Sequence, residues 1–342
     1  MKKLFKGILC AALCAAAVLG SAACGGKENT ERAQIYAPDG APALALTSLL
    51  AGEEEAAEKT FDVEVVNAQL IQTYVTGEKP KADFCILPLN AAANTVGTGE
   101  VYQMLGTVTN GNLYFLTDTN KDLPALTAEN LSEALLGKTL GAIQYEQVPG
   151  LTLRVVLEQY EIPYDVVEEN SHEAGKVHIR PIAPETVVPG TGCDYYLCPE
   201  PARTTKISAT SASPNPFRAA GSLQELYGGE GGYPQAVLVA KKAFIAAHKD
   251  IVEKVISYME NSENYLKTAT PETIVKLLDG RRTSGMGASF TVGNLNSTVI
   301  ANCSVRFTKS ENCKAAVLEF LTKLRGVAPA TKTPADEFFY TV

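Results

Sequence analysis

The sequence predicts an α/β protein made of two α/β units followed by a mainly helical C-terminal part. Three observations predict this class. Short β-rich runs alternate with helical runs from residue 33 onward. Residues 82–87 are almost continuously apolar, as expected of a parallel strand that is buried on both faces. The alternation starts again after residue 117, and the pattern beyond residue 243 is mainly helical.

The first unit has the order strand, helix, strand, helix, strand, helix. Pro38-Asp39-Gly40 is a turn, and Pro42 falls in the first turn of the helix that follows, where proline is tolerated. This order predicts a parallel sheet with helices on both faces. We expect strands at 33–37, 61–66 and 82–87, and helices at 41–52, 68–76 and 89–96.

Residues 101–117 leave two arrangements open. Two apolar runs, 101–109 and 113–117, flank Asn110-Gly111-Asn112. A turn between two apolar runs is typical of a β-hairpin. Alternatively, the chain passes as one long strand from the first unit to the second.

The second unit repeats the alternation and the C-terminal part follows it. Residues 204–232 are rich in Ser, Thr, Gly and Pro, which favours a loop. The other expected elements are strands at 139–143, 177–182, 193–197 and 236–240, and helices at 127–136, 149–160, 243–267, 271–279 and 312–324.

The N-terminus has the pattern of an export signal. Three lysines precede a short apolar stretch at 8–19, which is too short to anchor the chain across a bilayer. Small residues then precede Cys24, and this arrangement resembles the cleavage site of bacterial lipoproteins. Ser21 departs from that pattern, because an aliphatic residue is usual at its position.

The lipoprotein resemblance implies three features. They are a signal peptide over residues 1–23, lipidation of Cys24, and a flexible tether over 24–32 that is short, polar and glycine-containing. Together they place the protein at the cell membrane, lipid-anchored on its extracytoplasmic face. The alternative is ordinary cleavage nearby and release of a freely secreted protein.

Composition excludes two kinds of partner. The formal net charge is -8, and the predicted signal peptide carries three of the lysines, so the mature protein is more acidic still. This acidic balance argues against nucleic acid as a partner and against electrostatic docking on anionic lipid, since both need a basic surface. The length of 342 residues is sufficient for two domains.

Five cysteines follow Cys24, and an exported protein can use them in disulfides. A bridge between Cys303 and Cys313 would close a hairpin, and one between Cys193 and Cys198 a tighter loop. Buried free thiols are the alternative. His172, His178 and His248 fit no zinc-ligand spacing with the cysteines, so we expect neither a metal nor a cofactor. The fifth cysteine is Cys85.

Five segments, in order, resemble the NMT1/THI5-like solute-binding proteins, which include nitrate-, sulfonate/taurine- and thiamine-precursor-binding proteins. The segments are IYAPDGAPALAL at 35–46, ADFCILPLNAAANTV at 82–96, LGTVTNGNLYFLT at 105–117, LGKTLGAIQYEQVPGLTLRVVL at 136–157 and CDYYLCPEPARTT at 193–205. The resemblance implies a two-lobed type II periplasmic-binding-protein fold. Lobe 1 would hold residues 33–113 and 236–342, and lobe 2 residues 114–235.

A ligand in such a fold lies beyond the carboxyl ends of the strands, where loops lead into helices. Turn geometry is the alternative role for the glycines of these loops, capping for the asparagines, and an ion pair with Arg203 for Glu200. The expected ligand-binding residues are Asp39, Gly40, Ala41, Asn90, Asn110, Gly111, Asn112, Gln144, Tyr145, Pro149, Gly150 and Glu200.

The charges of these loops indicate a class of ligand. The loops contain no lysine or arginine, and Arg203 is the only cation near them in the sequence. The carboxylates of Asp39 and Glu146 in these loops, and of Glu200 facing them, would oppose a bound anion. We therefore expect a neutral or cationic heteroaromatic ligand, held by amide hydrogen bonds and by stacking on Tyr145 and Tyr114.

The resemblance implies the extracytoplasmic solute-binding subunit of an ABC importer, a monomer that works with permease and ATPase subunits. A ligand-sensing protein of the same fold is one alternative. An enzyme of pyrimidine synthesis, also similar to this family, is another. Such an enzyme needs a reactive lysine, a histidine and a cysteine-rich motif, and the sequence has no such cysteine cluster, no G-x-S-x-G elbow and no P-loop. We therefore expect no enzymatic activity.

Overall fold

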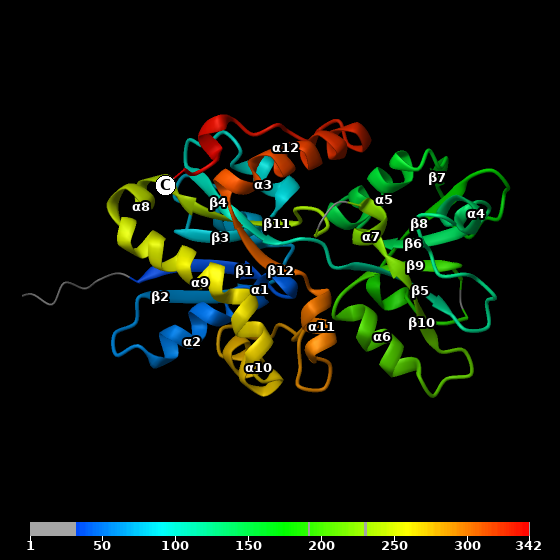
Figure 1. Cartoon of the computed structure of the whole chain (residues 1–342), viewed down its shortest axis with the longest axis horizontal. Coiled ribbons are helices and arrows are strands. Elements are labelled where there is room, and N and C mark those ends of the chain that lie inside the picture. The colour runs from blue at the N-terminus through cyan, green and yellow to red at the C-terminus, as the bar shows by residue number, and fades with distance from the viewer. Residues whose placement is uncertain (1–31, 191, 229–230, 342) are drawn as a thin grey trace, which may run out of the picture. The chain divides into compact units, whose positions relative to one another are not determined.

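The structure is a computed structural model that describes residues 32–190, 192–228 and 231–341 (Figure 1). The predicted signal peptide, Cys24 and the predicted tether up to residue 31 lie outside the described residues. Residues 33–342 form one compact unit. Within the described ranges, no helix combines the length and the apolar character that a membrane crossing requires.

The first sheet has six strands in the order β12-β4-β11-β3-β1-β2. The strand β1 pairs in parallel with β2 and β3, whereas β11 is antiparallel to β3 and β4, and β12 is antiparallel to β4. The sheet is therefore mixed rather than parallel throughout. Its strands are β1 (Ala33–Pro38), β2 (Phe61–Val66), β3 (Phe84–Pro88), β4 (Tyr102–Thr109), β11 (Ala236–Lys241) and β12 (Val305–Lys309).

The second sheet also has six strands, in the order β10-β5-β9-β6-β8-β7. The strands β9, β6, β8 and β7 are mutually parallel, and β5 is antiparallel to both β9 and β10. Its strands are β5 (Leu113–Asp118), β6 (Thr139–Ile143), β7 (Tyr164–Val166), β8 (Val177–Ile182), β9 (Tyr195–Pro199) and β10 (Phe217–Ser222). The predicted α/β class is confirmed, with two mixed sheets.

The segment 110–112 connects the two sheets. Because β4 belongs to the first sheet and β5 to the second, the hairpin that the sequence allowed is not formed. The chain returns after β10, since β11 lies at the centre of the first sheet. Two crossing segments, 110–112 and 231–235, therefore join the sheets.

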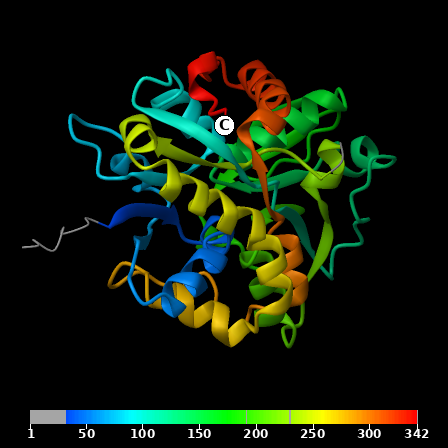
Figure 2. The ribbon, with the colours of Figure 1, turned by 60° about the vertical axis from the view of Figure 1, so that its left-hand side comes forward.

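Helices flank both sheets. Helices α2 and α9 lie side by side over the first sheet (Figures 1 and 2). The helices are α1 (Ala41–Leu44), α2 (Thr47–Glu55), α3 (Leu89–Thr95), α4 (Leu131–Leu135), α5 (Val148–Gln159), α6 (Ala202–Thr210), α7 (Leu223–Tyr227), α8 (Lys242–Ala247), α9 (Lys249–Thr268), α10 (Pro271–Asp279), α11 (Ser297–Asn302) and α12 (Ser310–Val327).

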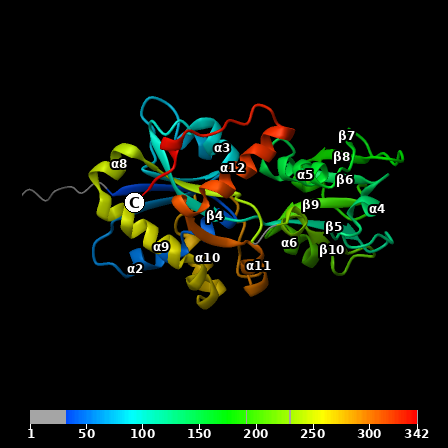
Figure 3. The same ribbon diagram turned by 45° about the horizontal axis from the view of Figure 1, so that its top comes forward.

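The hydrophobic core continues from one sheet to the other. Helix α12 packs on β4 and beside α5 (Figure 3), so one apolar cluster includes residues of both sheets. Tyr233, in the second crossing segment, stacks on Phe320 of α12 with ring centroids 5.1 Å apart. Separate clusters cover the other face of each sheet.

The predicted loop over 204–232 is wrong. This region contains most of α6, the strand β10 and the helix α7. Local composition hid them because α6 buries none of its side chains, which leaves no apolar stripe in its sequence. The strand β10 forms by pairing with β5, and its Phe217 packs edge-on against Tyr196. The secondary structure of this region therefore depends on residues that are distant in the sequence.

Several predicted helices are shorter or interrupted. Residues 68–76 contain only the 3-10 helix Ile71–Tyr74, and the helix expected at 127–136 begins at Leu131. The helix expected at 41–52 is divided into α1 and α2, and that at 243–267 into α8 and α9, with His248 between them. The strands β7 and β12 were not predicted; β7 has three residues, too few for a pattern.

Neither of the disulfides that the sequence suggested is formed. All five described cysteines are buried free thiols. Cys303 lies in the apolar cluster on one face of the first sheet and Cys313 in the cluster on the other, so the sheet separates them. The Cys313 thiol instead donates to the carbonyl oxygen of Thr308 at 3.4 Å. The Cys193 thiol contacts Oδ1 of Asn170 at 3.8 Å.

A buried histidine joins the edge strand β7 of the second sheet to its neighbour β8. The ring of His178 on β8 contacts Oδ1 of Asp165 on β7 at 2.8 Å and the carbonyl oxygen of Glu173 at 3.0 Å. The ammonium of Lys176 lies 2.8 Å from Oδ2 of the same aspartate. Hydrogen bonds from Lys176 and His178 lower the pKa of Asp165 below its ordinary value of 3.8.

Replacing Asp165 with asparagine is expected to lower the melting temperature by more at pH 7 than at pH 3. Because the carboxyl pKa is lower in the folded state, its stabilising effect is present above pH 3.8 and is lost as the pH falls through the folded-state pKa. Thermal denaturation at both values measures this, with the exposed Asp122→Asn as control. An equal loss at both pH values would contradict it.

Candidate functional site: a cleft at the strand ends of both sheets

A cavity of about 610 Å³ lies where parallel strands of both sheets end. It is lined by Pro38, Pro88 and Pro199, the last residues of β1, β3 and β9, and by Gln144, which follows β6. Its volume is within the range of small-molecule sites. We call this cavity the cleft. The other lining residues are Asp39, Gly40, Ala41, Pro42, Asn67, Ala68, Asn112, Gln147, Val148, Pro149, Glu200, Pro201, Ala202, Thr205, Lys206, Gln235, Ala236, Met286, Gly287, Ala288, Ser289 and Asn294.

Seven of the twelve predicted site residues line the cleft. They are Asp39, Gly40, Ala41, Asn112, Gln144, Pro149 and Glu200. Gly40 has a φ of 101°, a conformation that only glycine adopts readily, and it precedes α1 directly. Strand-end geometry therefore brings together residues more than 160 positions apart in the sequence.

Five predicted residues do not line the cleft. Asn90 lies in α3, where its Oδ1 accepts a hydrogen bond from the backbone of Ala91. Asn110 donates to the carbonyl oxygen of Arg306, on the opposite side of the first crossing segment from Asn112. A side chain at position 111 would collide with Gln224 and Tyr233, and the backbone φ of 94° also favours glycine. Packing and backbone conformation therefore explain Gly111.

Tyr145 and Gly150 shape the turn before α5 rather than lining the cleft. The Tyr145 ring lies under the guanidinium of Arg154, with 4.6 Å between them. A Cβ added at Gly150 would lie 2.1 Å from the carbonyl oxygen of Tyr145, so only glycine fits there. Tyr114, also expected to stack on the ligand, lies under Arg203 at 4.9 Å and outside the cleft. Neither of the two tyrosines expected to stack on the ligand therefore lines the cleft.

Glu200 is the centre of a saturated polar network at the wall of the cleft. Its side chain is fully buried. Its carboxylate accepts from Arg203 at 3.0 Å and from the hydroxyl and backbone N–H of Thr204 at 2.9 and 3.1 Å. Asn302 of α11 adds a fourth hydrogen bond at 3.1 Å, and its carbonyl oxygen accepts from the Tyr114 hydroxyl at 3.0 Å. The network fixes α11 against β5 and α6.

Asp39 is the second carboxylate of the cleft, and it is also paired. Its Oδ2 accepts a hydrogen bond from the backbone of Ser289 at 2.8 Å. Its Oδ1 lies 3.6 Å from Nη2 of Arg282, and both side chains are more than nine-tenths buried. The charge of Asp39 is therefore balanced by a cation that is 243 residues away in the sequence.

This pairing changes the electrostatic argument made from the sequence, in which Arg203 was the only cation near the loops. Arg203 and Arg282 balance the two carboxylates. Lys206 of α6 lines the cleft as a third cation, with its ammonium donating to the carbonyl oxygens of Pro184 and Val187 at 3.0 and 2.8 Å. The cleft therefore offers a cationic ligand no carboxylate without a partner.

Side-chain amides and prolines dominate the rest of the lining. The Gln235 Nε2 donates to Oδ1 of Asn112 at 2.9 Å, and its buried Oε1 has no hydrogen-bond partner among the described residues. Helices α5 and α6 begin at the cleft, and no described aromatic residue lines it. The lining amides are Asn67, Asn112, Gln144, Gln147, Gln235 and Asn294. This lining is suited to hydrogen bonding rather than stacking.

Sequence reasoning missed the segment 286–294 and Lys206. Ser289 reaches the cleft through its hydrogen bond to Asp39, and Asn294 donates to Thr205 of α6 at 3.2 Å. The element directly before 286–294 is helix α10 rather than a strand, so the strand-end rule does not indicate this segment. Lys206 lies in the second turn of a helix that was predicted as loop.

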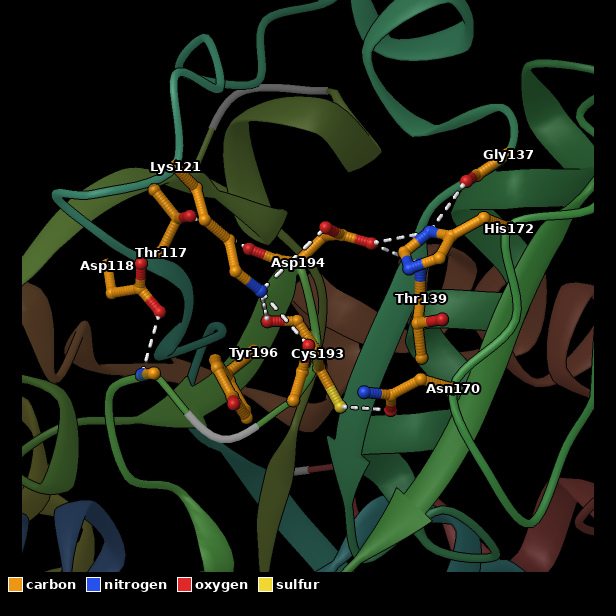
Figure 4. Close-up of polar contacts among 12 residues, drawn as sticks. Thr117, Asp118, Lys121, Gly137, Thr139, Asn170, His172, Cys193, Asp194 and Tyr196 are labelled. Carbon is orange, nitrogen blue, oxygen red and sulfur yellow. Dashed lines mark hydrogen bonds and ion pairs between the residues drawn. The ribbon is translucent and has the colours of Figure 1, made fainter.

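A second polar cluster, shown in Figure 4, lies where β6 and β9 begin, and none of its labelled residues lines the cleft. Asp194 accepts a hydrogen bond from the backbone of Thr139 at 2.8 Å, between Lys121 at 3.8 Å and His172 at 3.5 Å. Lys121 also donates to two backbone carbonyl oxygens there. Such contacts tie loops to strand ends. The described residues contain no group of three or more His, Cys, Asp or Glu side chains that could hold a metal ion.

Comparison with known proteins gives structural matches only. No family model and no curated protein matches the sequence. An ABC transporter structure from Parabacteroides distasonis is similar, with a TM-score of 0.64 and 17% identity, covering 91% of this chain and 99% of that chain. The periplasmic aliphatic sulphonate binding protein SsuA from Escherichia coli has a TM-score of 0.60 and 12% identity, with coverages of 91% and 92%.

A Candida albicans protein described as having the generic periplasmic binding protein fold is also similar. It has a TM-score of 0.53 and 12% identity, covering 90% of this chain and 93% of that chain. At these identities the likeness shows the fold alone. The chain therefore has the periplasmic-binding-protein fold, with a cleft at the strand ends of its two sheets.

Proposed function

We propose that this protein is the extracytoplasmic solute-binding subunit of an ABC importer. It captures a small molecule in the cleft and delivers it to permease subunits that an ATPase drives. The observation that carries the proposal is a cavity of about 610 Å³ lined by strand-end loops of both sheets. A ligand there contacts both halves of the chain at once, which is how such a site couples binding to closure.

Two finer features belong to the same proposal. The five sequence segments support membership of the NMT1/THI5-like group and the type II form of the fold. The lobes are 33–113 with 236–342, and 114–235. This division is supported by the strands, because all those of the second sheet fall between Leu113 and Ser222. The protein acts as a monomer and has no catalytic role.

The proposed ligand is neutral and rich in hydrogen-bonding groups. Both carboxylates of the cleft have arginine partners, so a cationic ligand would find no unpaired carboxylate to bind there. Of the six side-chain amides that line the cleft, Asn112 and Asn294 already both donate and accept within the protein. The other four retain groups for a ligand, including Oε1 of Gln235, which has no donor among the described residues. A neutral ligand, one of the two that the sequence led us to expect, therefore stays a prediction. The reason for expecting a cationic ligand no longer holds.

A ligand screen tests the proposal. Purified protein is heated with uncharged nucleobases, pyrimidines and amides, with amines, and with taurine and nitrate, and hits are confirmed by calorimetric titration. We expect a neutral compound to raise the melting temperature and to bind with a 1:1 stoichiometry. Tightest binding of taurine or nitrate would contradict the ligand class. Failure of every class of compound to bind would contradict the function.

Replacing Cys24 with alanine is expected to release the protein from the membrane. In the proposed lipoprotein, Cys24 carries the lipid, and a lipid-modified N-terminus is what holds the acidic protein at the membrane. Detergent phase partition of cell extracts measures this: the unaltered protein enters the detergent phase and Cys24→Ala stays in the aqueous phase. Cys14→Ala, inside the predicted signal peptide, is the control. Detergent partition of Cys24→Ala itself would contradict lipidation at this residue.

A further inference from the structure

A second cavity, of about 660 Å³, lies on the other side of the crossing segments from the cleft. Asn110 lines this cavity and Asn112 lines the cleft, while Gly232 and Gln235 are divided in the same way. We call it the hinge cavity. Its lining is Asn110, Tyr114, Ser222, Gln224, Glu225, Gly231, Gly232, Glu263, Leu266, Lys267, Ala269, Pro271, Ser297, Ile300, Ala301, Ser304, Val305 and Arg306.

The apolar part of the lining comes from the first-sheet side. Leu266 and Ala269 lie at the end of α9, and Ile300 and Ala301 lie on α11. Val305 at the start of β12 continues this surface. An apolar molecule that fills such a wall removes its own surface and that of the wall from water. The cavity volume is within the range that small molecules occupy.

The charges of the lining differ in how they are balanced. Glu263 and Lys267 pair with each other at 2.7 Å on consecutive turns of α9. Glu225, an exposed residue in the first turn of α7, has no ion-pair partner among the described residues, and its backbone N–H donates to the capping hydroxyl of Ser222. The guanidinium of Arg306 forms no hydrogen bond or ion pair with any residue of the described ranges. Arg306 is therefore the charge that an incoming group of opposite sign would meet.

The polar groups on the second-sheet side are already engaged. The Tyr114 hydroxyl donates to Asn302, and burial raises the pKa of Tyr114, so the phenol stays a neutral donor. The Gln224 side chain accepts from the backbone of Leu113 at 2.8 Å and donates to Ser222 at 3.1 Å. These hydrogen bonds hold the polar side chains in place. Arg306 is then the lining residue that can contact the charged group of a ligand.

We propose that the hinge cavity is a second small-molecule site, distinct from the cleft, which takes a carboxylic acid with an apolar body. The apolar chain lies against α9 and α11, and the carboxylate pairs with the guanidinium of Arg306. Arginine binds carboxylates through two parallel hydrogen bonds, which gives this pairing its specificity.

Calorimetric titration with octanoate and with 1-octanol tests the site. We expect octanoate to bind the unaltered protein with a 1:1 stoichiometry, and Arg306→Gln to weaken octanoate binding by about tenfold while octanol binding is unchanged. Ala301→Trp, which fills the cavity, is expected to abolish binding of both. Ala301→Ser, which leaves the volume open, retains both. The cleft variant Ala202→Trp also retains both, so the result is independent of the proposed transport function.

Folding of the tryptophan variant is checked directly. The sequence contains no tryptophan, so the emission of Ala301→Trp reports on that one side chain, and circular dichroism and thermal denaturation report on the whole. Ala246→Trp, at an exposed alanine of α8, is the matched control. Absence of octanoate binding to the unaltered protein, or unaltered binding to a folded Ala301→Trp, would overturn the proposal. Equal weakening of octanoate and octanol by Arg306→Gln would refute the role of the carboxylate.

Discussion

Replacing Glu200 with alanine is expected to lower the free energy of unfolding by about 3 kcal/mol, the cost typical of breaking a buried ion pair. The variant leaves the guanidinium of Arg203, only 17% exposed, without its carboxylate. It also removes the acceptor of Thr204 and Asn302. Urea denaturation followed by circular dichroism measures the change.

The matched control for this variant is Glu185→Ala, at an exposed glutamate near the start of the 3-10 helix Pro184–Thr186. It is expected to change the free energy of unfolding by less than about 0.5 kcal/mol. Because Asn302 belongs to α11 and Glu200 follows β9, the loss at Glu200 reports on contact between the two halves of the chain. Equal effects of the two substitutions would show that the network adds nothing to stability.

Replacing Ala202 with tryptophan is expected to weaken solute binding by about 100-fold. Ala202 is the first residue of α6 and lines the cleft together with Pro201 and Lys206. An indole there takes space that a solute needs, while Ala202 itself contributes no buried apolar contact to the core. Calorimetric titration with the compound identified by screening measures the affinity.

Ala246→Trp on α8 is the control for this substitution as well, since it adds the same side chain at an exposed site far from the cleft lining. Circular dichroism and thermal denaturation establish that Ala202→Trp is folded. Retention of full affinity in a folded Ala202→Trp would place the solute elsewhere in the molecule.

The strands of both sheets were predictable where burial requires a run of apolar residues in the local sequence. The strand β3 is buried along almost its whole length, and its sequence, FCILP, is apolar for the same reason. The region 204–232 was not predictable, because α6 buries nothing and β10 exists through its pairing with β5. The antiparallel places of β11 and β12 in the first sheet also depend on long-range pairing.

The cleft, too, was predictable from the sequence only in part. Asp39, Gln144 and Glu200 could be selected because parallel strands end at one edge of a sheet, and each of them follows such a strand. The charge of the cleft could not be read in the same way, since Arg282 reaches Asp39 from 243 positions away. Sequence order gives the strand ends, but only the folded chain shows which charges have partners.

The most direct test of the central claim is a crystal structure of the protein with the solute that the screen identifies. We predict electron density for the solute in the cleft, in contact with loops of both sheets, including Asp39 or Gly40 on one side and Gln144 or Pro149 on the other. Density for the solute bound to one sheet alone, or outside the cleft, would contradict the account.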